Sequence, residues 1–330
     1  MYFTKPLLMQ LEITKLCPFN CPQCYNKQRN IMSMDIFDVK QRINEAIKFG
    51  VRRIVLNGGE PLLYPRLEEL IEYVSNLKVK IGIYSSGYML NEKIINRLKQ
   101  CHNIDINISL NGSSDEINSR SRQGFRFAFD AMQICCVNHV EYGIVFVCRH
   151  DNINDLQNLS KLGEKLGAKV LFLTINRPNG NGKIDSPLNY DDMLHIKNIL
   201  NNHKGKIKIK IDTCFGMLGA FLGLPASIIT GCAAGIYSYS INVYNQFRPC
   251  THLDIAENCR SAEEYWSGSA TLNAIREWDC SDTQGCSSCV YRKNCSPCYA
   301  IYGINNGKQI SHRDTLHQST NAHRQAAAKL

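Results

Sequence analysis

Two adjacent segments near the start of the chain decide the fold: Leu7-Leu-Met-Gln-Leu-Glu-Ile13 and Thr14-Lys-Leu-Cys17-Pro-Phe-Asn-Cys21-Pro-Gln-Cys24-Tyr25. The first is apolar and predicts a buried β-strand. The second carries three cysteines on one short loop. Three thiolates can hold three irons of a cubic 4Fe–4S cluster and leave the fourth iron open to a small molecule. A zinc site is the alternative, but structural zinc takes four protein ligands and no fourth one stands nearby.

The composition describes a globular chain with a substantial core. Hydrophobic residues make up 44% and charged residues 20% of the 330 positions, a length typical of one large domain and a smaller one. No apolar run approaches the ~20 residues of a membrane span. Residues 1–6 leave no room for a signal peptide before the first strand. We therefore expect a cytoplasmic protein without a membrane partner.

Sixteen cysteines are many for such a chain, and without a secretion signal they favour metal binding over disulfides. Nine of them follow residue 210. Four others lie in apolar segments and predict core packing: Cys101, Cys135, Cys136 and Cys148. The net charge of +9 suits a solvated basic surface. We expect no nucleic-acid partner, because the sequence contains neither zinc-finger spacing nor a basic–aromatic repeat.

Apolar runs and amphipathic stretches alternate from residue 7 to about residue 176. The apolar runs predict six strands, over residues 7–13, 53–56, 80–84, 105–110, 143–148 and 169–175. Helices are expected near residues 35–49, 65–77, 91–100, 125–138, 152–166 and 190–202. Such alternation predicts a parallel sheet with right-handed crossovers. Cysteines, glycines and tyrosines become frequent from residue 207, so a domain boundary is expected near 205.

The cysteine loop, including the aromatic Tyr25 after its third cysteine, resembles the cluster loop of the radical S-adenosylmethionine (radical SAM) superfamily. The resemblance implies an α/β fold. Residues 1–205 would form a partial (β/α)6 barrel, an open, TIM-like structure, and residues 206–330 a small cysteine-rich α+β domain. The chemistry of such barrels sits at the C-terminal ends of the strands, where this loop is expected.

Four further segments at predicted strand ends resemble the superfamily's cosubstrate motifs: Asn57-Gly58-Gly59-Glu60-Pro61, Ser85-Ser86-Gly87, Ser109-Leu-Asn-Gly112 and Arg122-Gln-Gly124. The resemblance implies that Gly58, Gly59 and Glu60 lie at the methionyl amino group of S-adenosylmethionine. Ser109 would bond its ribose or carboxylate region. Ser86 occupies a position where relatives often carry asparagine.

Arg122 would bind the methionyl carboxylate, a bidentate task that suits arginine, although a surface charge is the alternative. Tyr25 would cover the adenine. The implied reaction begins when the open iron binds the amino and carboxylate groups of S-adenosylmethionine and a flavodoxin- or ferredoxin-like donor supplies one electron. Cleavage of the sulfonium–carbon bond then gives a 5′-deoxyadenosyl radical, which removes a hydrogen atom from a substrate at the barrel mouth.

A second group of cysteines resembles the SPASM domain, a module that holds auxiliary 4Fe–4S clusters. Its motifs are Cys232-Ala-Ala-Gly235, Arg248-Pro-Cys250 and Cys286-Ser-Ser-Cys289-Val-Tyr-Arg-Lys-Asn-Cys295-Ser-Pro-Cys298. The resemblance implies two auxiliary clusters. One would take Cys232, Cys250 and Cys298, and the other Cys286, Cys289 and Cys295. One or two structural zinc sites are the alternative.

The fourth ligands are where the sequence departs from the family pattern. The first auxiliary cluster usually has a cysteine a few residues before the Cys232 position, but here Cys214 stands eighteen residues upstream. It can ligate only if the intervening segment folds back; otherwise one iron stays open to substrate. No cysteine follows Cys298, so His317 is proposed as the last ligand of the second cluster, since histidine ligates some iron–sulfur clusters. The alternatives are Cys280, Asp314 and His312.

Relatives with such a domain mostly modify peptides or proteins, so the resemblance implies a radical SAM peptide maturase. It would form a crosslink or a thioether, or epimerise a residue. A separate leader-binding protein or the barrel surface would have to bind the leader, because no N-terminal extension precedes the cysteine loop. The alternatives are oxidation of a small molecule or cofactor precursor, maturation of a sulfatase by formylglycine formation, or a non-catalytic electron carrier. Cys214 and Asp212 are candidates for a proton- or hydrogen-transfer residue only if they face the cavity.

Overall fold

The computed structural model describes residues 2–26, 31–177, 186–229, 231–277, 291, 298–302, 304–305 and 308–309. Within them lies one nine-stranded sheet in the order β7-β6-β5-β4-β3-β2-β1-β8-β9. Its strands are β1 (Leu8–Thr14), β2 (Arg53–Gly58), β3 (Lys80–Ser85), β4 (Ile104–Ser109), β5 (Tyr142–Cys148), β6 (Val170–Ile175), β7 (Lys208–Ile211), β8 (Ser238–Ile241) and β9 (Phe247–Arg248). Neighbouring strands are parallel except β9, which pairs antiparallel with β8.

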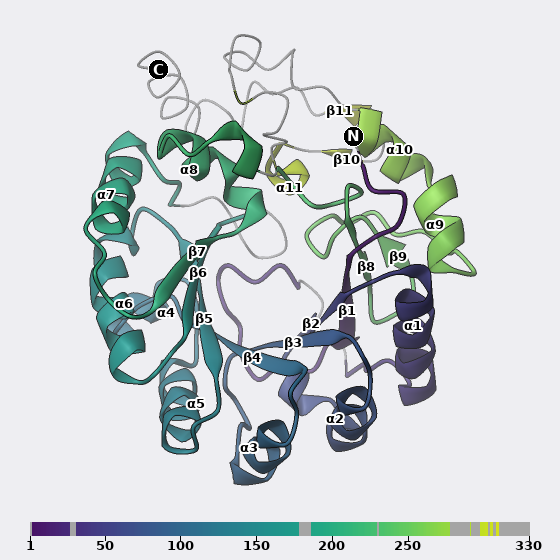
Figure 1. Ribbon diagram of the computed structural model, residues 1–330, viewed down its shortest axis with the longest axis horizontal. Coiled ribbons are helices and arrows are strands. Elements are labelled where there is room, and N and C mark those ends of the chain that lie inside the picture. Colours follow the sequence, from purple (N-terminus) through teal and green to yellow (C-terminus); the bar gives the residue numbers. More distant parts are fainter. Residues whose placement is uncertain are drawn as a thin grey trace.

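The sheet curves into an open barrel with helices on its outer side (Figure 1). The helices are α1 (Ile36–Phe49), α2 (Leu67–Ser75), α3 (Glu92–Lys99), α4 (Asp115–Ser119), α5 (Phe125–Val137), α6 (Leu156–Lys165), α7 (Tyr190–Asn201), α8 (Gly216–Phe221), α9 (Ala262–Gly268), α10 (Ala270–Glu277) and α11 (Tyr299–Tyr302). A short hairpin, β10 (Ile304–Asn305) and β11 (Lys308–Gln309), lies beyond α11. The predicted partial barrel is confirmed, and its six predicted strands are β1 to β6.

Local sequence explains where the helices begin. The Asp35 carboxylate accepts a hydrogen bond from the Phe37 amide at the start of α1, and Gly50 ends that helix with a φ of 121°. Asn189 and Asp192 form a reciprocal capping box at the start of α7. The predicted helix near 152–166 begins instead as a 3-10 turn, Ile153–Asp155, before α6.

Strand β1 shows how the barrel wall is built. Met9, Leu11 and Ile13 are fully buried in the main hydrophobic core, which also contains Val39 and Ile43 of α1. Because side chains alternate across a strand, Gln10, Glu12 and Thr14 point to the opposite, inner face. The inner face of the barrel is therefore polar near its mouth, where the cysteine loop leaves β1.

Elements after residue 205 extend both edges of this sheet. β7 adds to β6 at one edge, and β8 adds to β1 at the other. Trp266 of α9 belongs to the main hydrophobic core, and its indole N–H donates to the Phe3 carbonyl oxygen at 3.0 Å. The predicted boundary near 205 falls between α7 and β7 and stays a prediction. No helix among the described residues is long and apolar enough to cross a membrane.

Candidate active site and auxiliary cysteine site

The first cysteine loop leaves the C-terminal end of β1, as predicted. Cys21 is buried, and Cys17 and Cys24 are half-buried. The backbone amide of Gln123 donates a hydrogen bond to Cys21, with its nitrogen 3.4 Å from the sulfur. Burial raises the pKa of Cys17 to about 11. Since thiolates bind iron, loading this loop must displace protons from its thiols.

Gly58, the last residue of β2, and Gly59, which follows it, pack against the backbone at the start of the cysteine loop. The Gly59 amide donates to the Thr14 carbonyl oxygen at 2.7 Å, and the Glu60 amide donates to the Leu16 carbonyl oxygen at 2.7 Å. A Cβ at Gly59 would fall on the Leu16 carbonyl oxygen, and one at Gly58, whose φ is 130°, on that of Thr14. Glycine is therefore required here so that two backbones can touch. The predicted cosubstrate contacts of Gly58 and Gly59 stay a prediction.

Gly59→Ala is expected to destabilise the fold by about 1–3 kcal/mol, because the new methyl group displaces the cysteine loop. Urea unfolding measures the change. Gly268→Ala is the matched control, since a Cβ there meets no atom within 4 Å. Equal stability of the two variants would contradict the packing described here.

The Glu60 carboxylate accepts several hydrogen bonds from other groups of the protein. It accepts hydrogen bonds from Ser85 Oγ at 2.7 Å, from the Ser86 amide at 2.8 Å, from the Leu62 amide at 3.1 Å and from Ser86 Oγ. Burial raises the pKa of Glu60, and the bonds from Ser86 and Ser85 act in the opposite direction. This carboxylate therefore ties the end of β2 to the end of β3. The pairing of Ser86 with Glu60 was not foreseen from the sequence.

A third segment, residues 121–124, packs against the other side of the loop. The Asn20 amide donates to Gln123 Oε1 at 2.6 Å, and the Gln23 amide to the Ser121 carbonyl oxygen at 3.3 Å. Gly124 has a φ of 86° and faces the Phe19 ring, which would collide with a Cβ. The sequence signal for this contact was the Arg122-Gln-Gly124 motif, although it was assigned only to cosubstrate binding.

Arg122 offers an independent test of the predicted cosubstrate. Its Nε is buried and, among the described residues, makes no hydrogen bond. A buried guanidinium nitrogen without an acceptor is costly, so a carboxylate ligand would complete it. Ser109 lies half-buried at the end of β4. These groups fit a cluster with bound S-adenosylmethionine: three thiols, a backbone amide directed at one sulfur, and a guanidinium whose Nε has no hydrogen-bond acceptor among the described residues.

Tyr25 lies inside the barrel mouth. Its hydroxyl donates to the Gly58 carbonyl oxygen at 3.3 Å. Its ring centroid is 4.9 Å from that of His252. Burial lowers the pKa of His252 well below its usual value, and the nearby positive charge of Arg177 acts in the same direction. The predicted contact of Tyr25 with adenine stays a prediction.

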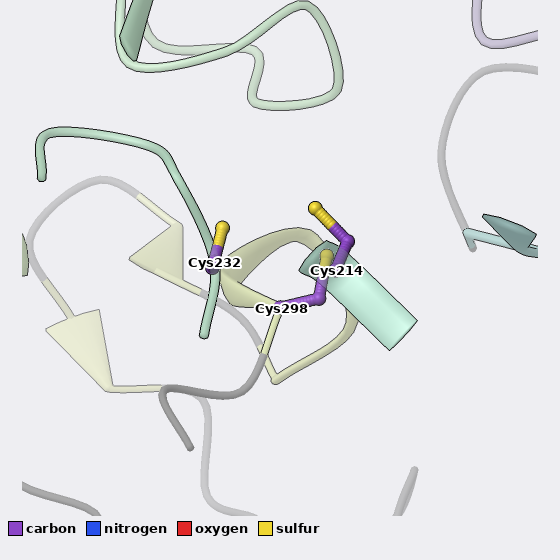
Figure 2. Close-up of side chains that lie close together, drawn as sticks. All are labelled: Cys214, Cys232 and Cys298. Atoms are coloured by element: carbon purple, nitrogen blue, oxygen red, sulfur yellow. The ribbon is translucent and has the colours of Figure 1, made fainter. Parts of the chain in front are cut away.

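A second cysteine site forms where the chain returns to the barrel mouth. The sulfur atoms of Cys214, Cys232 and Cys298 lie within 4.8 Å of one another (Figure 2). Cys250 packs against the same small core, and burial together with Cys298 and Cys214 raises its pKa to about 12. The segment after Cys214 therefore folds back far enough to bring Cys214 to Cys232, and its role as a ligand stays a prediction. The set has the thiol chemistry and the burial that an auxiliary cluster requires.

The remaining predicted residues divide into two groups. The Asp212 carboxylate accepts from Thr174 Oγ1 at 2.8 Å and from Arg177 at 3.0 Å, and its side chain is 35% exposed. Its role as a proton- or hydrogen-transfer residue stays a prediction. The predicted ligands of the second auxiliary cluster lie outside the described residues: Cys286, Cys289, Cys295 and His317, with the alternatives Cys280, His312 and Asp314.

Comparison with known proteins identifies the domain. The family model of the Radical SAM superfamily matches residues 11–163. An AdoMet-dependent heme synthase of Methanosarcina barkeri is 23% identical over 324 residues, covering 89% of this chain and 91% of that protein. The mycofactocin maturase MftC of Mycobacterium tuberculosis is 24% identical over 317 residues, covering 88% of this chain and 77% of that protein.

Solved structures share the fold. SuiB of Streptococcus suis, bound to its precursor peptide SuiA, superposes with a TM-score of 0.79 at 16% identity, covering 96% of this chain and 77% of that one. The structure of anSMEcpe with bound AdoMet gives a TM-score of 0.70 at 16% identity, covering 98% of this chain and 92% of that one. The family match identifies residues 11–163 as a radical SAM domain, a domain that implies a 4Fe–4S cluster and S-adenosylmethionine, and the solved structures show that its fold is shared.

Proposed function

We propose that this radical SAM enzyme removes a hydrogen atom from a peptide and thereby installs a crosslink, a thioether or an epimerised residue. The observation that carries the proposal is the contact between the two cysteine sites. Tyr25 follows Cys24 of the first, His252 stands two residues after Cys250 of the second, and their ring centroids are 4.9 Å apart. Both sites therefore border one barrel mouth, and a substrate seated there is adjacent to both.

A bound 4Fe–4S cluster with S-adenosylmethionine supplies the 5′-deoxyadenosyl radical that removes the hydrogen atom. The chain supplies the geometry. Cys17, Cys21 and Cys24 would hold the cluster, and the Gln123 amide stabilises the Cys21 thiolate. Arg122 would bind the cosubstrate carboxylate through its unpartnered Nε. Glu60 keeps the strand ends in place around them, and its predicted direct contact with the cosubstrate belongs to the same proposal.

The second site is proposed as a fully ligated auxiliary cluster with Cys214, Cys232, Cys250 and Cys298. With a thiolate on every iron it would have no open position, so its role would be electron transfer rather than substrate binding. A further auxiliary cluster, with Cys286, Cys289, Cys295 and His317, remains part of the proposal. The division of the chain into two domains, residues 1–205 and 206–330, is also part of the proposal.

Two kinds of relative bear on the substrate. MftC is named a maturase, and SuiB was crystallised with a precursor peptide; both support a peptide substrate. A separate leader-binding protein and a flavodoxin- or ferredoxin-like electron donor belong to the proposal without support from these relatives. The match to the AdoMet-dependent heme synthase spans 91% of that protein. It supports a second candidate function, oxidation of a small molecule such as a tetrapyrrole side chain.

The test is incubation of the reduced, reconstituted protein with S-adenosylmethionine and peptides encoded by neighbouring reading frames. We expect 5′-deoxyadenosine together with either a loss of two hydrogens from the peptide or an isobaric product that has taken up solvent deuterium. Mass spectrometry distinguishes the two. A haem precursor in place of the peptide is the parallel arm, and turnover of that substrate alone would refute the peptide assignment.

A further inference from the structure

Three aromatic rings gather at the surface beside the first cysteine loop. Phe19 belongs to the loop itself and stands between Cys17 and Cys21 in the sequence. Its ring centroid is 5.7 Å from that of Tyr88 and 5.7 Å from that of Phe127. The rings of Tyr88 and Phe127 are 4.9 Å apart and meet edge to face, an arrangement that aromatic pairs favour. The rings therefore form one cluster that includes part of the loop.

The backbone keeps this cluster exposed. Phe127 lies in the first turn of α5 and is 42% exposed. Gly87, with a φ of 85°, packs the turn after β3 against α5, since a Cβ there would fall 2.7 Å from the Phe127 carbonyl oxygen. Met89 is 49% exposed and has a φ of 67°, a left-handed conformation that is unfavourable for residues other than glycine. We call Phe19, Tyr88, Met89 and Phe127 the apolar patch.

The apolar patch has the composition of a contact surface. Large apolar side chains that are exposed together mark interaction sites, and aromatic residues and methionine are enriched in them. A strained backbone that holds a methionine in solvent agrees with such a role. The patch involves α5, which lies on the outer side of the sheet (Figure 1). The proposed substrate seat is instead at the barrel mouth, beside Tyr25 and His252. A partner other than the substrate is therefore required.

Three properties identify the class of partner. Electron transfer between proteins slows steeply with distance, so a reductant must dock close to the loop, and Phe19 is part of that loop. Four side chains make a small contact, and redox proteins dock through small, transient interfaces. The net charge of +9 attracts an acidic protein over a long range. The exposed edge of a flavin is flat and apolar, which suits a surface of aromatic rings.

We propose that the apolar patch is the docking surface for an acidic protein that delivers one electron from a reduced flavin. The anionic flavin hydroquinone loses one electron and becomes the neutral semiquinone. The cluster that Cys17, Cys21 and Cys24 would hold gains that electron, and no bond forms or breaks. The inference rests on the proposed function in assuming that this loop holds an iron–sulfur cluster. It does not depend on which substrate the enzyme modifies.

The experiment uses the full reconstituted chain and reduced flavodoxin as the probe. Anaerobic stopped-flow absorbance gives the second-order rate constant for oxidation of the flavodoxin hydroquinone. Dithionite, a small reductant that needs no docking surface, drives a parallel reaction in which 5′-deoxyadenosine is measured. One variant, Phe127→Glu, places a negative charge in the patch. The other, Met89→Gly, removes an exposed side chain at a backbone position that suits glycine.

We expect Phe127→Glu to lower the rate constant with flavodoxin about tenfold and to leave the dithionite-driven reaction unchanged. Added salt should lower the same rate constant for the unchanged protein. Met89→Gly should lower it as well, without loss of stability in urea unfolding, which separates a docking contact from a structural one. Phe127→Glu should also weaken the binding of oxidised flavodoxin to the chain prepared without iron, followed by flavin fluorescence.

Phe37→Glu is the matched control, because Phe37 is 71% exposed in the first turn of α1 and lies outside the apolar patch. Its rate constants should equal those of the unchanged protein. The inference would be overturned by an unreduced unchanged protein, by an unaffected Phe127→Glu variant, or by an equal loss in the control or with dithionite. Faster docking of a ferredoxin at the same patch would overturn the flavin assignment. Dithionite without 5′-deoxyadenosine would refute the proposed function itself, and a failed peptide assay only the peptide assignment.

Discussion

Cys21→Ala is expected to reduce 5′-deoxyadenosine formation to the level of a reaction without enzyme. Cys21 is the buried thiol of its loop and receives the Gln123 amide at 3.4 Å, so its loss removes a ligand and leaves that amide unpaired. Chromatography of the quenched reaction measures the product. Auxiliary iron should be unaffected, which separates loss of the first cluster from general misfolding.

Cys136→Ala is the control for this prediction. Cys136 is half-buried on α5 and is not among the predicted ligands. Its replacement should leave 5′-deoxyadenosine formation unchanged. A Cys21→Ala enzyme that turned over at the rate of the Cys136→Ala enzyme would show that the loop does not hold the reactive cluster.

Cys214→Ala is expected to remove the iron of one auxiliary cluster, about four atoms per chain, or to leave it with an open and oxygen-sensitive iron. The reason is the convergence of Cys214, Cys232 and Cys298 within 4.8 Å. Iron analysis and the visible absorption spectrum of anaerobically prepared protein measure the change. Zinc in place of iron in the unchanged protein would contradict the cluster assignment.

Cys259→Ala provides the comparison for Cys214→Ala. Cys259 is also half-buried and also follows residue 210, but it packs against the main core rather than against the second cysteine site. Its replacement should preserve iron content. A loss of iron in both variants would indicate that the effect comes from weakened packing and not from a missing ligand.

The barrel could be predicted closely because its strands are apolar runs bounded by polar segments. Predicted residues 53–56 became Arg53–Gly58, and predicted residues 80–84 became Lys80–Ser85. Helix α4 was missed since five residues give too short a pattern for helical periodicity. The edge strand β7 was missed because it is four residues long and is defined by its neighbour in the sheet.

The candidate site was predictable as a set of residue types but not as a set of contacts. Spacing along the chain identified the first cysteine loop. It could not show that Gln123 would approach Cys21, which depends on how residues after β4 pack. Cys214 stayed undecided since its approach to Cys232 depends on Phe215 and Leu218, which are fully buried and anchor the returning segment. Such contacts depend on packing between segments that are far apart in the chain, and local sequence patterns do not predict that packing.

The open barrel has two edges, and the second cysteine site joins them. Cys214 follows β7 at one edge, whereas Cys232 precedes β8 and Cys250 follows β9 at the other. Metal bound by these thiols would link the two edges of the barrel, which no strand pairing joins among the described residues. The free energy of metal binding would then also be free energy of holding the mouth in shape. Oxidative loss of that metal would therefore impair the enzyme twice, by removing an electron carrier and by releasing the two walls between which the substrate must sit.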